Sequence, residues 1–270
     1  MTRKRRKTQA QLADKYVCYQ NSVQEPEADV PVLTRIFKKL RGRPPLSMRE
    51  DFCGTAALAC EWVRSRKDRS AYGVDLDPEP LEWGREHNIG SLSPEQQSRV
   101  KLIEGDVLTT GHEPVDLTCA FNFSYFLFRK REELIHYFRQ ARATLNDDGI
   151  LLLDVYGGPE SQQTQTEERD CDGFTYIWEQ ASFDPIHNHG RNFIHYEFPD
   201  GSRLNRAFSY EWRIWQLPDL REALADAGFR HTQVYWEGID RKTGEGNSVF
   251  SLKETAKDDP AWIAYIAAVP

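Results

Sequence analysis

The chain has 270 residues, of which 39% are hydrophobic and 29% are charged, and its formal net charge is −7. This length fits one or two domains, and the hydrophobic content is too high for a chain that stays disordered. No uncharged apolar run approaches the roughly 18 residues that a membrane-spanning helix needs, which excludes a membrane protein.

The charges are unevenly distributed. Five of the 35 basic residues lie at positions 3–7, so the rest of the chain carries 30 basic against 42 acidic side chains. An acidic body disfavours a broad nucleic-acid surface, although the basic tip at residues 2–7 could touch an anionic partner. No apolar segment follows this tip, so we expect no secretory signal and a cytoplasmic protein. An odd number of cysteines, five, agrees with a reducing compartment.

The first 156 residues predict helices followed by alternating strands and helices. Two helical stretches cover residues 9–40 and break near Glu25 and Pro26, and Pro44 and Pro45 then end helix formation. Strands are predicted at residues 46–50, 71–75, 100–103, 115–121 and 150–155. Helices are predicted between them, at residues 56–65, from residue 78 onward and at residues 130–145. This alternation is typical of a parallel sheet with helices on both faces.

The pattern changes after a polar run, residues 157–172, that we interpret as a loop. Eleven aromatic residues lie between Phe174 and Trp215, and they alternate with polar residues in three runs. Three antiparallel strands are therefore expected as an insertion. A helix over residues 218–227 and strands over 229–237 and 262–269 complete the chain, and the last two strands should form an antiparallel hairpin because residues 238–260 lack helical periodicity.

The motif with the clearest chemical meaning lies where the first strand turns into the first helix, at residues 49–56 (Arg-Glu-Asp-Phe-Cys-Gly-Thr-Ala). Small residues there let a ligand approach the backbone and the helix N-terminus. Asp75 ends the second strand, where a carboxylate can accept both hydroxyls of a ribose. Asp106 ends the third strand. Three acidic strand ends at one sheet edge suit a nucleoside ligand without phosphates, which disfavours a dinucleotide.

In these residues the sequence resembles the class I S-adenosylmethionine-dependent methyltransferases. Glu50 matches the acid that opens their glycine-rich motif, Asp75 their ribose-binding acid, and Asp106 their adenine-side acid. The resemblance covers about residues 46–155 and 217–269 and implies a Rossmann-like doubly wound sheet that binds S-adenosylmethionine. The cofactor-binding residues that it implies are Tyr19, Glu50, Phe52, Gly54, Asp75, Leu76, Asp106, Val107, Asn122 and Phe123.

One position departs from the family pattern. Phe52 stands where the glycine-rich motif has its first small residue, and only Gly54 is glycine. Another interpretation of the acids is that Glu50 and Asp51 form a solvated turn and that Asp75 caps the next helix.

The acceptor side is predicted from the aromatic insertion, which we interpret as a cap. Ring faces attract cations, so an amine is the favoured acceptor. The candidate substrate contacts are Tyr125, Tyr156, Trp178, Tyr210, Trp212 and Arg213, and the candidate proton acceptors are His195, Glu179 and Glu197. The other interpretation is an ordinary half-buried sheet with one solvated face. His187 and His189 are interpreted as turn residues, and no metal site is expected.

These observations divide the chain into four parts. Residues 1–45 form a tail and a helical lid with Tyr19 over the donor, 46–156 the binding core, 157–215 the substrate cap, and 216–270 the end of the core. The expected activity is methyl transfer to a small molecule, possibly an amine. The alternatives are methyl transfer to protein or RNA, with the basic tip as the docking element, and a catalytically silent S-adenosylmethionine-binding module.

Overall fold

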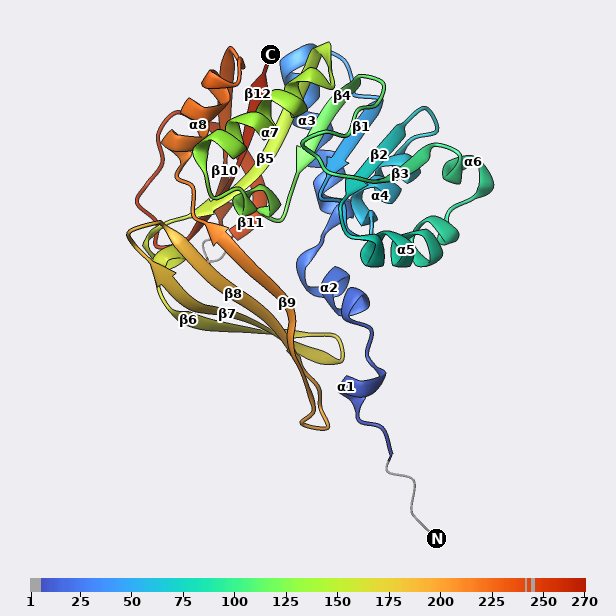
Figure 1. The fold of residues 1–270 in the computed structure, drawn as a ribbon, viewed down its shortest axis with the longest axis vertical. Coiled ribbons are helices and arrows are strands. Elements are labelled where there is room, and N and C mark those ends of the chain that lie inside the picture. The colour runs from blue at the N-terminus through green and yellow to red at the C-terminus, as the bar shows by residue number, and fades with distance from the viewer. Residues whose placement is uncertain (1–5, 241, 244–245) are drawn as a thin grey trace. The chain divides into compact units, whose positions relative to one another are not determined.

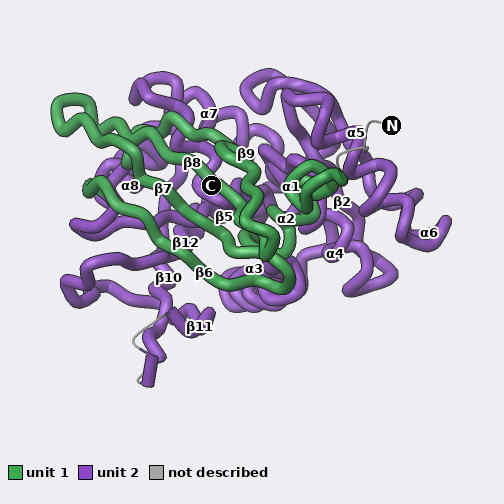
Figure 2. Tube along the Cα trace, turned by 90° about the horizontal axis from the view of Figure 1, so that it is seen from below, with its two compact units in different colours: residues 1–24, 162–214 green, residues 25–161, 215–270 purple. Residues whose placement is uncertain are grey.

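The computed structural model describes residues 6–240, 242–243 and 246–270. The chain forms two compact units (Figure 2). Unit 1 contains Met1–Gln24 and Gln162–Ile214, and unit 2 contains Glu25–Ser161 and Trp215–Pro270. Most of the basic tip, residues 2–5, lies outside the described residues, whereas Arg6 and Lys7 are exposed. Within the described ranges, every helix is too short or too polar to span a membrane.

Unit 2 contains an eight-stranded sheet with the order β11-β10-β12-β5-β4-β1-β2-β3 (Figure 1). Strands β1 to β5 pair in parallel. β12 pairs antiparallel with both β5 and β10. The strands are β1 Ser47–Asp51, β2 Ser70–Asp75, β3 Val100–Glu104, β4 Val115–Ala120, β5 Leu145–Gly157, β10 His231–Ile239, β11 Gly246–Lys253 and β12 Trp262–Val269. The predicted doubly wound, mostly parallel sheet with a reversed hairpin is confirmed.

Helices cover both faces of this sheet (Figure 1). They are α3 Pro26–Arg41, α4 Ala57–Ser65, α5 Pro78–His87, α6 Pro94–Gln97, α7 Arg131–Ala143 and α8 Leu217–Asp226, with 3-10 turns at Ile89–Ser91, Ser124–Leu127 and Pro159–Gln162. Apolar residues of α3, α4 and α5 form one core cluster with Met48 of β1. Asp51, at the end of the same strand, faces α7 on the opposite side of the sheet, where its carboxylate accepts a hydrogen bond from the hydroxyl of Tyr137. Successive residues of a strand point to opposite faces, which explains this division.

β11 is an edge strand that the sequence analysis did not predict. It lies within residues 238–260, which were expected only to connect the last two strands. Phe250 is its one buried side chain among the described residues, and Val249 and Leu252 are exposed. An edge strand with a single buried residue has no period-two pattern to detect.

Unit 1 contains a four-stranded antiparallel sheet, β6 Gln165–Cys171, β7 Phe174–Asp184, β8 His189–Glu197 and β9 Arg203–Arg213, with helices α1 Gln9–Leu12 and α2 Lys15–Val23. Three of the strands were predicted. β6 was interpreted as a loop because its side chains are polar and exposed, and a solvated edge strand lacks the apolar alternation that identifies a strand.

The N-terminal helices do not belong to one segment. α3 is part of the core of unit 2, through Val30, Leu33 and Phe37. α1 and α2 instead join the sheet of unit 1, since Ala10 and Cys18 cluster with its aromatic residues. The division at Gln24 and Glu25 differs from the expected lid of residues 1–45. The physical reason is that the apolar stripe of α3 packs against α4 in the core of unit 2. The spacing of the apolar residues predicts such a stripe, but it does not say which element the stripe packs against.

Candidate donor-binding site

The turn between β1 and α4 contains three left-handed residues at alternate positions. Phe52, Gly54 and Ala56 have φ angles of 58°, 51° and 57°. This backbone region favours glycine, and a residue with a side chain adopts it only when its surroundings compensate. The backbone of a glycine-rich turn is therefore present here with a single glycine. A Cβ atom placed on Gly54 would meet no atom within 4 Å, so a ligand has room against this backbone.

The ring of Phe52 packs against other rings of unit 2. It lies 6.0 Å from the ring of Phe128 and 5.6 Å from that of Tyr137, both of which are buried. These contacts compensate for its left-handed backbone. A phenylalanine with a left-handed backbone is thus held in the turn by the packing of its ring.

Asp75 connects this turn to the end of β2. One carboxylate oxygen accepts the backbone N–H of Gly54 at 2.7 Å, and the other accepts that of Asp77 at 2.9 Å. The cap of α5 is Asp77, whose side chain accepts the N–H of Glu79, so Asp75 is not the helix cap of the alternative interpretation. The two oxygens of a carboxylate have about four acceptor positions, so Asp75 can accept a further hydrogen bond from a ligand. Beside it, Leu76 is 69% exposed, which is unusual for leucine next to a buried strand.

Glu50 and Asp51 have different surroundings although both are buried. Asp51 pairs with Arg49 at 2.5 Å and accepts the hydroxyl of Tyr137 at 2.9 Å. Among the described residues, Glu50 accepts one hydrogen bond, from the N–H of Ala59 at 2.9 Å. Burial, together with the nearby carboxylates of unit 2, raises the pKa of Glu50 to about 8. Neither residue is the solvated turn of the alternative interpretation.

Arg49 also holds the loop after β3, which contains Asp106 and Val107. Its guanidinium donates to the carbonyls of Val107 at 3.3 Å and Thr110 at 2.8 Å. Val107 is buried, and the exposed Asp106 accepts the N–H of Leu108 at 2.9 Å. The buried arginine therefore sets the position of this loop relative to the β1 turn.

The loop after β4 is held by Asp154 of β5. Asn122 and Phe123 are both left-handed, and their N–H groups donate to Asp154 at 2.6 and 3.0 Å. In place of the predicted substrate contact, Tyr125 is fully buried, and its hydroxyl donates to the carbonyl of Asp154 at 2.6 Å. Tyr125 therefore supports the loop from beneath. The ring of Tyr156 lies 4.7 Å from that of Phe123.

Four carboxylates that lie near the β1 turn or near Asp154 have no cationic partner within 4.0 Å among the described residues. They are Asp29, Glu50, Asp75 and Asp154, and the described residues place no lysine, arginine or histidine in an ion pair with any of them. Burial raises the pKa of Asp154 to about 8 and that of Asp29 to about 6. The charges of Asp29 and Asp75 contribute to the raised pKa of Glu50. This part of unit 2 therefore favours a ligand that brings positive charge.

In unit 1, His195 does not have the arrangement of a proton acceptor. Its Nδ1 accepts the backbone N–H of Arg206 at 3.1 Å, so the proton lies on Nε2, which donates to Glu179 at 2.8 Å. Both nitrogens are used. The register of β8 and β9 shifts between Ile194 and Tyr196, and Arg206 is left-handed there. We correct the expected role of His195: it holds this bulge in the sheet.

The other predicted residues of unit 1 separate into two groups. The rings of Trp178, Tyr210 and Trp212 lie 4.6 to 6.0 Å apart and form one cluster on β7 and β9. Tyr19 belongs to the same unit, 4.7 Å from the ring of Phe208. Glu197 is exposed and pairs with Arg203 at 3.5 Å. Arg213 is half-buried at the end of β9, opposite His189.

The fold has well-defined relatives among solved structures. An S-adenosylmethionine-dependent methyltransferase from Clostridium acetobutylicum ATCC 824 superimposes over 94% of this chain and 98% of its own, with a TM-score of 0.65 and 16% identity. The fold is that of class I methyltransferases. A sugar N-methyltransferase from Streptoalloteichus sp ATCC 53650 (TM-score 0.61, 17% identity, 93% and 92% of the two chains) and an amino pentose methyltransferase from Micromonospora echinaspora (0.64, 15%, 93% and 95%) share it. No protein-family model and no curated protein sequence matches the chain.

Three residues that shape this candidate site were missed by the sequence analysis. Asp154 is a lone acid inside the apolar run 150–155, and Arg49 is a lone cation inside a buried strand. A charge in such a run is expensive to bury and therefore marks a specific partner. Asp29, whose carboxylate accepts the hydroxyl of Tyr265 at 3.0 Å, carries no such signal because its helix is amphipathic.

The left-handed turn predicts opposite effects for two alanine-to-glycine substitutions. Ala56 and Ala59 are both fully buried, but Ala56 is left-handed and Ala59 lies inside α4. We expect Ala56→Gly to leave the free energy of unfolding unchanged or raise it by up to about 1 kcal/mol. Ala59→Gly should lower it by about 1 kcal/mol. Urea denaturation measures both, and equal losses in the two variants would contradict the left-handed turn.

The raised pKa of Glu50 predicts how stability depends on pH. A carboxyl whose pKa is higher in the folded than in the unfolded protein binds a proton in the folded state only, between about pH 4.5 and 8. Stability should therefore fall as pH rises through this range and level off above it. Glu50→Gln should reduce the slope by about 1.4 kcal/mol per pH unit, the value for one proton. Urea denaturation from pH 5 to 9 measures the slope, and identical slopes for both proteins would show that Glu50 is ionised throughout.

Proposed function

We propose that the protein is an S-adenosylmethionine-dependent methyltransferase that acts on an amine of a small molecule. The observation that carries the donor assignment is the β1 turn, in which three left-handed residues leave open space above Gly54 and Asp75 accepts the N–H of Gly54. The solved methyltransferases that share the fold support the same assignment.

The donor residues fit S-adenosylmethionine in shape and in charge. The free acceptor positions of Asp75 suit the two ribose hydroxyls, and the exposed Leu76 and buried Val107 offer apolar surface to an adenine ring. S-adenosylmethionine carries a sulfonium and an ammonium against one carboxylate. The unpaired carboxylates of Glu50 and Asp29 would be stabilised by that excess of positive charge.

Bound S-adenosylmethionine supplies an electrophilic methyl group. The contribution of the chain is then chiefly to hold donor and acceptor in line. Asp154 and Arg49 hold the loops after β4 and β3, and Asn122 and Phe123 line the first of these loops.

The acceptor assignment rests on the aromatic cluster of unit 1. Trp178, Tyr210 and Trp212 form a cluster of aromatic rings, and the faces of such rings attract a cation. The chain is also acidic overall, which favours a basic substrate. Two of the solved proteins that share the fold are a sugar N-methyltransferase and an amino pentose methyltransferase. Amino sugars are therefore the first acceptors to test.

Calorimetric titration of S-adenosylmethionine tests the donor site. We expect micromolar binding, and Asp75→Ala should weaken it at least about 10-fold, which corresponds to about 1.4 kcal/mol. Asp77→Ser is the matched control, since it removes a neighbouring charge but keeps a residue that caps α5. It should change affinity less than about 2-fold. Equal weakening in both variants, or no binding to the unmodified protein, would refute the donor assignment.

A further inference from the structure

One buried polar side chain of unit 1 lacks a hydrogen-bond partner. Asn192, in the middle of β8, is 3% exposed, and its amide nitrogen Nδ2 is buried without a partner among the described residues. Buried polar groups in folded proteins are normally hydrogen-bonded, so each exception needs an explanation.

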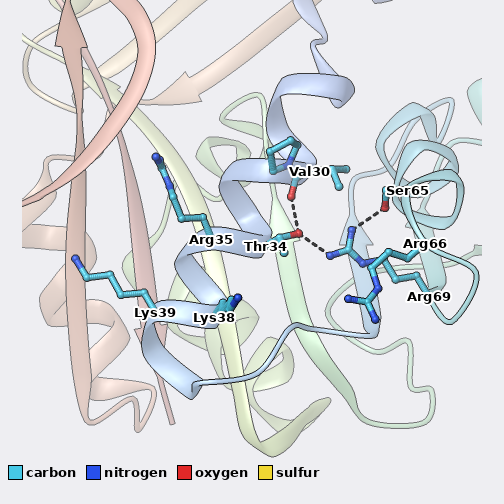
Figure 3. A pocket seen from close by; sticks show the side chains of 9 residues that line it. Val30, Thr34, Arg35, Lys38, Lys39, Ser65, Arg66 and Arg69 are labelled. Atoms are coloured by element: carbon cyan, nitrogen blue, oxygen red, sulfur yellow. Dashed lines mark hydrogen bonds between the residues drawn. The ribbon is translucent and has the colours of Figure 1, made fainter.

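A buried polar group with a structural role has its partners in place, and Arg69 of unit 2 shows this ordinary case. Arg69 is 2% exposed, and its guanidinium donates to the hydroxyls of Thr34 and Ser65, both at 2.6 Å (Figure 3). It also lies over the ring of Trp62, 3.8 Å from the ring centre. These contacts account for the burial of Arg69. Asn192 has no comparable set of contacts.

Gln180 provides a closer comparison, because it lies opposite Asn192 on the neighbouring strand β7. It is 5% exposed. Its Nε2 donates to the carbonyl of Gln163 at 2.6 Å, and its Oε1 accepts the indole N–H of Trp178 at 3.4 Å. Two amides of similar burial thus lie side by side on one face of the sheet, and the amide nitrogen of Gln180 has a partner whereas that of Asn192 has none.

Asn192 lies beneath the aromatic cluster formed by Trp178, Tyr210 and Trp212. Tyr210 of β9 pairs with Asn192, and Trp178 of β7 pairs with Ile194, two residues further along the same face of β8. Adjacent strands lie about 4.8 Å apart, so β7 and β9 are roughly 10 Å apart. The rings of Trp178 and Tyr210 are nevertheless 6.0 Å apart. They therefore lean toward each other over β8 and over Asn192.

Gly190 leaves space beside this amide. A Cβ atom placed on Gly190 would lie 3.6 Å from Nδ2 and 3.8 Å from Oδ1 of Asn192, which is ordinary contact without a clash. The backbone of Gly190 is not left-handed, so its conformation does not require glycine. A glycine inside a strand gives up packing and often marks the close approach of a ligand. The unpaired amide and the space at Gly190 are two separate observations that indicate the same place.

We propose that Asn192 is a specificity-determining residue of the acceptor site and that its amide donates a hydrogen bond to a hydroxyl oxygen of the acceptor. This inference rests on the proposed function, which places the amine of the acceptor at the aromatic cluster. The acceptor is then an amino alcohol, a class that includes the amino sugars, rather than a simple alkyl amine. The ring faces above Asn192 are only weak acceptors for an amide N–H, so a ligand oxygen binds it better.

The first test compares the thermal unfolding of Asn192→Leu and Gln180→Leu. Asn192→Leu removes an unpaired polar group, so its unfolding midpoint should equal or exceed that of the unmodified protein. Gln180→Leu removes a paired group of similar burial, so its midpoint should fall. Equal losses in the two variants would show that Asn192 has a structural partner and would overturn the proposal.

The second test measures transfer of a labelled methyl group from S-adenosylmethionine to trans-2-aminocyclohexanol and to cyclohexylamine, two amines that differ by one hydroxyl. A buried donor that the wrong ligand leaves unpaired discriminates strongly, so we expect a kcat/KM at least about 10-fold higher for the amino alcohol. Asn192→Leu should lower this ratio at least about 10-fold, whereas Gln180→Leu should change it less than about 2-fold.

The outcomes separate this proposal from the proposed function. Transfer to both amines with equal kcat/KM, or a ratio that Asn192→Leu leaves unchanged, overturns the role of Asn192 and retains methyl transfer to an amine. Absence of transfer to either amine overturns the role of Asn192 together with the amine assignment. Because the ratio compares two substrates of the same variant, a general loss of activity in a less stable variant does not alter it.

Discussion

The structure of unit 2 depends on one constraint, the left-handed backbone of the turn between β1 and α4. Phe52, Gly54 and Ala56 must all adopt a conformation that only glycine adopts freely. Their surroundings compensate: Phe128 and Tyr137 hold the ring of Phe52, and Asp75 accepts the N–H of Gly54. The result is a turn that exposes backbone beside the end of β2. A nucleoside could not approach β1 without it.

Buried charge organises the loops around this turn. Arg49 joins β1 to the loop after β3, and Asp154 joins β5 to the loop after β4. The cost of burying Arg49 is offset by its ion pair with Asp51 and by several hydrogen bonds. Burial outweighs the hydrogen bonds that Glu50 and Asp154 accept, and the pKa of each carboxyl rises to about 8. Residues at binding sites often contribute less to the stability of the folded protein than other residues could, since the ligand supplies the missing interaction.

Much of unit 2 could be predicted from sequence because strands alternate with helices and because β1, β2 and β3 each end in an acid. Asp75 was located at a strand end by this pattern alone. The pattern could not distinguish strands β6 and β11 from loops, because the described side chains of these strands are mostly exposed, with Phe250 the one buried residue of β11. Nor could it assign His195 its role. That role depends on a bulge in β8 and β9, and a bulge follows from pairing register. Asp154 was visible as a charge in an apolar strand and Arg49 as the one cation of β1, but the loop residues that they hold are distant in sequence.

Methyl transfer itself tests the central claim most directly. The measurement is transfer of a labelled methyl group from S-adenosylmethionine to a panel of amino sugars and of their hydroxyl analogues, by the unmodified protein and by Trp178→Ala. The account predicts transfer to an amine, no transfer to the matched hydroxyl compound, and at least a 10-fold lower kcat/KM in the variant. Transfer only to hydroxyl compounds, or an unchanged kcat/KM in Trp178→Ala, would contradict it.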